Sequence, residues 1–203
     1  MTTADTAHAS AVDPTVAWSR RVRRIGGFIQ TGFAAFWLIR GSLVIGGPAG
    51  VGLAAFFSAT VVAAVAYAVQ VTAHVAPRPA GRDATRIERA VTLATIIQLA
   101  ASFAAPALAI ATGHADWALP SIAITIGPLL LWLDHRVDIP RYRPIGWTLI
   151  IGPVILAATM SGTALAATTG ITAGSLLLGT ALAGFHDLSQ LHLPTSPAKT
   201  PPS

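Results

Sequence analysis

The sequence predicts an all-α fold, a polytopic transmembrane helical bundle with six spans and both termini in the cytoplasm. Three observations support this prediction. Of the 203 residues, 53% are hydrophobic and only 10% are charged, whereas soluble domains carry about 25% charged residues. The apolar stretches, of roughly 16 to 27 residues, match the length of about 20 residues that a helix needs to cross a bilayer. The arginines gather in short patches between these stretches, as the positive-inside rule describes.

The charged and apolar segments divide the chain into a central domain and two tails. Residues 1–19 are small and polar and are expected to form a disordered cytoplasmic tail. Residues 20–187 are expected to form the six-helix transmembrane domain. Residues 188–203 are rich in proline and are expected to form a second disordered cytoplasmic tail. In chain order, the spans are predicted at residues 25–45, 50–74, 90–112, 117–134, 145–161 and 164–185.

The connections between the spans contain the signals that end helices. The stretch LWLDHRVDIPRYRPIG, residues 131–146, is the most polar segment in the middle of the chain. Pro140 disfavours helix at Ile139 and cannot donate a backbone hydrogen bond, so the fourth span must end before it. Pro144 is suited to the first turn of the fifth helix. The stretch is therefore predicted to be a short cytoplasmic turn.

The cationic residues predict the orientation of the chain. Twelve of the 13 lie outside the apolar spans. The arginine patches precede the first span, follow the second and follow the fourth, so they share one side only if the chain crosses the membrane six times. The connections on the other side contain no Lys or Arg. The use of Arg in place of Lys is typical of GC-rich bacteria, and the predicted location is the bacterial plasma membrane.

Composition and motifs also exclude several classes of protein. The net charge of +5 does not indicate nucleic-acid binding, because no segment is long enough to form a basic soluble face. Cysteine is absent, which rules out disulfides, thiol catalysis and thiolate metal sites. Nucleotide-binding glycine loops and hydrolase or metalloprotease motifs are missing too. We therefore expect no catalytic residues and no cofactor.

Three glutamines inside the apolar runs are the first candidate for a functional group. Gln30, Gln70 and Gln98 lie five to nine residues from the cytoplasmic ends of the first three spans, which is roughly 8–13 Å deep. They are expected to occupy one layer. Two interpretations remain open: hydrogen bonds that join helices, or a polar path for a small solute.

Arg40 is the single cation within an apolar run. It lies 16 residues after Arg24, or about 24 Å along a helix, near the outer interface. One interpretation is a side chain that reaches outer phosphates. The other is an anion contact inside the bundle, or an ion pair with Asp116.

Histidines and aspartates form a candidate rim at the predicted cytoplasmic ends of spans two, four and six. A stable metal site generally needs three or four converging ligands, and the neighbouring arginines would compete for the carboxylates. We therefore expect no metal site here, although convergence of the histidines would indicate a membrane enzyme. The rim residues are His74, Asp134, His135, Asp138, His186 and Asp187.

Glycines in the last span give a candidate packing face. Gly170 and Gly174 form a G-x-x-x-G pair, and such pairs let helix backbones approach closely in lipid. We expect this face to serve a homo-oligomer or a partner membrane protein, with the lipid bilayer as the remaining partner.

The span pattern, the stretch WLDHRVDIPRYRPIG and the glycine-rich GITAGSLLLGTALAGF together resemble small six-helix bacterial integral membrane proteins of unknown function. The resemblance covers residues 20–190 and implies no activity or cofactor. From the residues, the leading hypothesis is a non-enzymatic accessory protein or passive carrier. The alternatives are a small-solute transporter with a polar path through helices one to three, and a membrane enzyme that acts on lipid.

Overall fold

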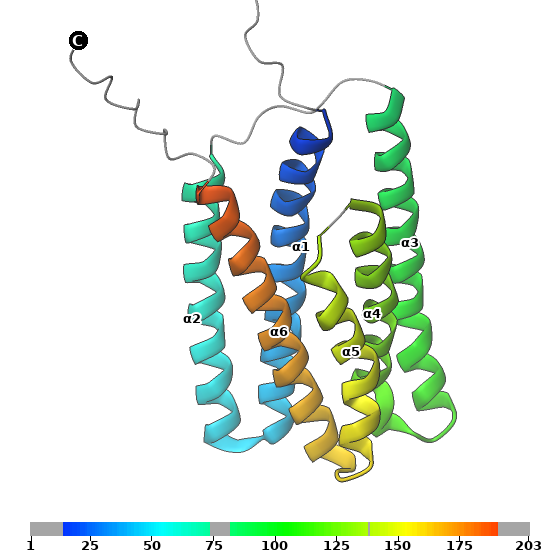
Figure 1. Cartoon of the computed structure of the whole chain (residues 1–203). Helices are drawn as coiled ribbons and strands as arrows, with labels where there is room; N and C mark the ends of the chain where they lie inside the picture. The colour runs from blue at the N-terminus through cyan, green and yellow to red at the C-terminus, as the bar shows by residue number, and fades with distance from the viewer. Residues whose placement is uncertain (1–13, 74–81, 138, 191–203) are drawn as a thin grey trace, which may run out of the picture.

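A computed structural model of the chain confirms the all-helical fold (Figure 1). It describes residues 14–73, 82–137 and 139–190. Six α-helices and one 3-10 turn follow each other along the chain. In order, they are α1 (Pro14–Ile45), α2 (Gly47–Thr72), α3 (Arg82–Ala111), η1 (Ala115–Trp117), α4 (Ala118–Val137), α5 (Tyr142–Ala157) and α6 (Gly162–Gln190).

Two helices begin earlier than we expected. α1 begins at Pro14, within the segment assigned to the N-terminal tail, and proline is well suited to a first helical position. α3 begins at Arg82, within the predicted basic loop, because Arg, Ala and Glu are good helix formers whether or not lipid surrounds them. The apolar part of α3 starts only at Val91. Apolar runs therefore predicted the apolar part of each of these helices, but not its full length.

Five of the helical segments are long and apolar enough to cross a membrane, namely Arg23–Ile45, Gly47–Thr72, Val91–Ala111, Ala115–Arg136 and Gly162–Gln190. α5 is also apolar but has only 16 residues, or about 24 Å, whereas a bilayer core is about 30 Å thick. The number of helices matches the prediction. Long apolar helices of this kind indicate a membrane-embedded protein.

The centre of the bundle is the close pair α1 and α6. A Cβ added to Gly170 would lie 2.7 Å from the Cα of Gly41, and one added to Gly174 would lie 3.0 Å from the backbone nitrogen of Leu38. The glycine face of α6 is therefore covered by α1 of the same chain. The space that Gly170 and Gly174 provide is thus used within the chain, and a partner on this face stays a prediction.

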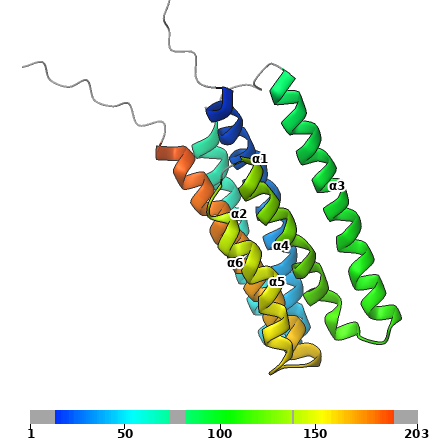
Figure 2. The same ribbon diagram turned by 45° about the vertical axis from the view of Figure 1, so that its right-hand side comes forward.

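The other helices surround this pair unevenly. α2 packs on α1 and α6, and α5 packs between α4 and α6. α3 packs chiefly on α4 and η1, and Figure 2 shows it to one side of the other helices. Large apolar side chains remain exposed along α3, among them Leu93, Ile97, Phe103 and Leu108. Such a surface suits lipid and is unusual for a protein in water.

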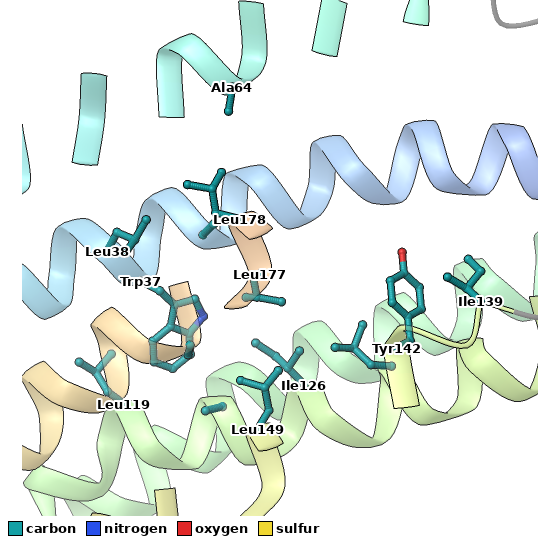
Figure 3. Close-up of a cluster of buried hydrophobic side chains, with 14 residues drawn as sticks. Trp37, Leu38, Ala64, Leu119, Ile126, Ile139, Tyr142, Leu149, Leu177 and Leu178 are labelled. Atoms are coloured by element: carbon teal, nitrogen blue, oxygen red, sulfur yellow. The ribbon is translucent and has the colours of Figure 1, made fainter. Parts of the chain in front are cut away.

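Buried side chains from five helices form the main core (Figure 3). Trp37 of α1 lies at the centre, among Leu119 and Ile126 of α4 and Leu177 of α6. Near one end of this core, Tyr142 of α5 points its hydroxyl toward α1 (Figure 3). The core thus reaches as far as the turn between α4 and α5.

Candidate functional site: a cleft between α1, α3 and α4

A cleft of about 370 Å³ lies between α1, α3 and α4. Ligand sites typically have volumes of about 300–1,000 Å³ and mostly apolar walls. The walls here are apolar, with Ile25, Ile29 and Phe33 on α1, Ile96 and Leu99 on α3, and Ile126, Leu129, Leu130 and Leu133 on α4. Since α3 packs chiefly on α4 and η1, its side toward α1 remains open and forms this space.

Polar groups occur at two levels of the cleft. Arg21 and Glu88 line it near the starts of α1 and α3. Gln30 and Gln98 line it further in, nine residues after Arg21 and ten after Glu88, which is about 14–15 Å along each helix. Thr92 and Thr95 of α3 also line the cleft between these levels. The cleft is thus charged at one end, largely apolar along its walls and lined by amides at depth.

Gln98 joins α3 to α4. Its Nε2 donates hydrogen bonds to Ser102 Oγ at 2.9 Å and to Thr125 Oγ1 at 3.2 Å. Each such bond within a membrane protein contributes about 0.6 kcal/mol. The amide therefore holds α3 on α4 at the inner end of the cleft, where apolar packing alone would not fix the register.

Gln30 and Tyr142 separate the cleft from a second, smaller space. Both residues are buried, and both line the cleft. Both also line a pocket of about 10 Å³ together with Arg23, Arg141 and Thr180. That volume is close to the minimum that holds one water molecule. The pair is thus a polar partition between the apolar cleft and an arginine-lined pocket.

One carboxylate connects three parts of the bundle beside this pocket. Arg23 Nη1 of α1 lies 3.5 Å from Asp187 Oδ2 of α6, and Arg141 of the α4–α5 turn donates from Nη2 to the same oxygen. Two guanidinium groups share one negative charge, so the cluster keeps an excess of positive charge. Two of its donors, Arg23 Nε and Arg141 Nη1, are buried without a hydrogen-bond partner among the described residues.

The structure brings together two of the three predicted glutamines. Gln30 and Gln98 line the same cleft, whereas the side chain of Gln70 is exposed on α2 and does not line it. A helix has several faces at one depth, so equal depth along the sequence did not imply a shared site. The polar residues that line the cleft come from α1, from α3 and, through Tyr142, from α5.

The predicted rim residues lie at or beyond the limits of the described chain. His74 and Asp138 lie outside the described residues. His135 and His186 are exposed, Asp134 is half-buried, and Asp187 faces arginines. Within residues 14–73, 82–137 and 139–190, no group of three or more His, Asp or Glu side chains lies close enough to hold a metal ion.

Arg40 and Asp116 do not form the ion pair that we considered. The Arg40 side chain is exposed, as the interfacial interpretation requires. Asp116 Oδ2 instead accepts a hydrogen bond from the backbone N–H of Gly162 at 3.4 Å. That contact ties η1 to the start of α6, at the end of the bundle opposite the arginine-rich patches.

Sequence reasoning missed the importance of Arg23, Arg141 and Tyr142. The proline that ends α4 was recognised, but the packing of the following turn against the bundle was not. Ile139 and Tyr142 are buried, so the turn is drawn into the bundle and carries Arg141 with it. The one available signal was the apolar Ile139 and the aromatic Tyr142 within an otherwise polar turn.

Comparison with known protein families, curated proteins and solved structures finds no match for this chain. The resemblance to small six-helix bacterial membrane proteins therefore stays a prediction.

Proposed function

We propose that the protein lies in a bacterial plasma membrane with six spans and both termini in the cytoplasm. The starts of α1 and α3, the end of α2, the α4–α5 turn and the end of α6 lie at one end of the bundle (Figure 1). The arginine patches belong to these segments, which favours this end as the cytoplasmic one. The contact between Asp116 and Gly162 supports a sixth span, because it brings the far end of α5 beside η1.

We further propose that the protein is a non-enzymatic passive carrier for an amphiphilic molecule that enters from the bilayer. The observation that carries this proposal is the cleft of about 370 Å³ between α1, α3 and α4. Its apolar walls suit a hydrocarbon chain. Gln30 and Gln98 offer hydrogen bonds at a depth where lipid offers none, and Ser102 and Thr125 continue the polar groups beyond Gln98.

A transport assay tests this function. Purified protein is reconstituted into phosphatidylcholine liposomes with a trace of a fluorescent NBD-labelled phosphatidylcholine, and dithionite bleaches the label in the outer leaflet. A carrier should let bleaching proceed beyond the outer half of the label. Ile96→Trp fills the cleft and should slow this second phase at least several-fold.

A matched control comes from the next residue on the same helix. Ile96 is 59% exposed and lines the cleft, whereas Ile97 is 61% exposed and does not line it. Ile97→Trp should therefore leave the rate unchanged. If the parent protein moves no more label than empty liposomes, the carrier function is wrong.

An accessory or assembly role is the second candidate. The observation that favours it is the exposed apolar side of α3, which packs chiefly on α4 and η1. A partner helix bound along this side would replace lipid. Co-purification of one stoichiometric membrane partner, lost in Phe103→Ser but kept in Phe56→Ser on α2, would favour this role over the carrier.

A further inference from the structure

The rim of the cleft is lined by a cation, Arg21, and an anion, Glu88, at the level where its apolar walls begin. Arg21 lines the cleft, and the apolar span of α1 begins two residues later, at Arg23. On the opposite wall, the apolar span of α3 begins at Val91, just after Glu88. In a membrane-spanning bundle, this places the rim at the level of the lipid headgroups and the walls below it in hydrocarbon.

The length of the cleft matches one leaflet of a bilayer. From Arg21 to Phe33, both of which line it, α1 advances by about 18 Å. One leaflet of the hydrocarbon core is about 15 Å thick, half of the whole core. A single acyl chain that enters at the rim would therefore lie along the walls, with its polar end at Arg21.

The charge at this end favours an anionic head. Among the described side chains there, eight arginines stand against three carboxylates, namely Arg20, Arg21, Arg23, Arg24, Arg89, Arg136, Arg141 and Arg143 against Glu88, Asp134 and Asp187. Asp187 is already shared by Arg23 and Arg141. Phosphate oxygens match the fork of a guanidinium group, and the excess of positive charge favours a phosphate head without a cation of its own over a zwitterionic head.

We propose that the occupant of the cleft is an anionic phospholipid of the leaflet at the arginine-rich end, with its phosphate on Arg21 and one acyl chain between α1, α3 and α4. The proposal rests on the proposed function and names its substrate class. A bound helix of a partner protein would match the apolar walls, but it would not account for a cation at the headgroup level of the same cleft.

Native mass spectrometry of protein released from nanodiscs of equal phosphatidylglycerol and phosphatidylcholine tests the proposal. An arginine near the membrane surface favours anionic lipid by about fivefold, so the parent should retain about fivefold more phosphatidylglycerol than phosphatidylcholine. Arg21→Gln should remove most of this preference. Arg24→Gln removes the same charge from a residue that does not line the cleft and should keep most of it.

The position of the acyl chain in the cleft is tested in parallel. Ile96→Trp should lower the retention of both lipids at least several-fold, and Ile97→Trp should not. Elution volume and helical circular dichroism confirm that each variant is folded. Equal losses in Arg21→Gln and Arg24→Gln would reduce the preference to general surface charge and overturn the headgroup assignment.

The two proposals fail in different ways. Retained lipid that depends on Ile96 but shows no headgroup preference would overturn the anionic head and leave the carrier function standing. Phosphatidylglycerol bound through Arg21, with no label moved in liposomes, would overturn the carrier and keep the site. No retained lipid in any variant would overturn the lipid assignment itself.

Discussion

Gly41 of α1 and Gly170 of α6 meet backbone to backbone, so that a Cβ on Gly170 would lie 2.7 Å from the Cα of Gly41. Apolar side chains gain nothing by leaving lipid for another apolar surface, and helix association in membranes depends on such close approach. The contact lies in the central helix pair, so the remaining helices depend on it.

Gly170→Ala should lower the free energy of unfolding by about 1–3 kcal/mol, the usual cost of overpacking. The measurement is thermal or detergent-induced unfolding of the purified protein. Gly179→Ala on the same helix is the control, because a Cβ there meets nothing within 4 Å. It should be neutral or slightly stabilising, since Ala favours a helix over Gly by about 1 kcal/mol. Equal effects of the two changes would contradict the close contact.

Asp187→Asn should destabilise the arginine-rich end of the bundle. The three side chains of this cluster are 26%, 31% and 34% exposed, so solvent screens them and the expected loss is modest, about 1 kcal/mol. Raising the salt from about 0.1 to about 1 M should shrink the difference from the parent, because the Debye length falls from about 10 to about 3 Å. Unfolding curves at the two salt concentrations measure this.

Asp134→Asn is the control for that experiment. Asp134 is a half-buried carboxylate on α4 that takes part in no ion pair within the described part of the chain. Its replacement should change stability little at either salt concentration. A loss as large as that of Asp187→Asn would indicate an effect of net charge rather than of the pairs with Arg23 and Arg141.

Single introduced cysteines test the proposed membrane topology, since the chain contains no native cysteine. Ala49→Cys and Thr159→Cys should react with a membrane-impermeant maleimide from outside the cell, and Gln190→Cys only after the membrane is opened. Thr159 is the decisive position, because it follows the short helix α5. Labelling of position 49 but not of 159 from outside would mean that α5 enters the membrane without crossing it.

Gln98→Leu should loosen α3. One hydrogen bond to Thr125 of α4 and one to Ser102 within α3 are lost, and the bond between the helices contributes about 0.6 kcal/mol. Hydrogen exchange followed by mass spectrometry should show faster exchange in α3, with α1 and α6 unchanged. Gln70→Leu on the exposed side of α2 should leave exchange in α3 as it was. Unchanged exchange in Gln98→Leu would show that packing on α4, with the contact between Ser102 and Thr125, holds α3 without the amide.

Much of the helical layout could be predicted from the apolar runs and the arginine patches. These signals depend on bilayer thickness and on headgroup charge, and both act on each segment separately. Which face of each helix points into the bundle could not be predicted in the same way. Gln70 and Gln30 lie at similar depth, yet one is exposed and one is buried, because lipid and bundle interior are equally apolar and hydrophobicity does not distinguish them.

The candidate site was predicted only in part for the same reason. Gln30 and Gln98 were identified because amides are rare in apolar runs. The space between them depends on α3 packing chiefly on α4 and η1, which no local pattern specifies. Asp187 was assigned to a rim of possible ligands, whereas its partners, Arg23 and Arg141, come from segments 164 and 46 residues away.

The shortness of α5 has a consequence for the membrane around the protein. α5 begins well below the ends of α1 and α3 in both views (Figures 1 and 2), and its 16 residues span about 24 Å. In the proposed six-span arrangement, a hydrocarbon core of about 30 Å thins to match it. The bilayer surface should therefore dip at this flank of the bundle, so that headgroups and water follow Arg141 inward and the distance that a polar head must travel through hydrocarbon is shortest there.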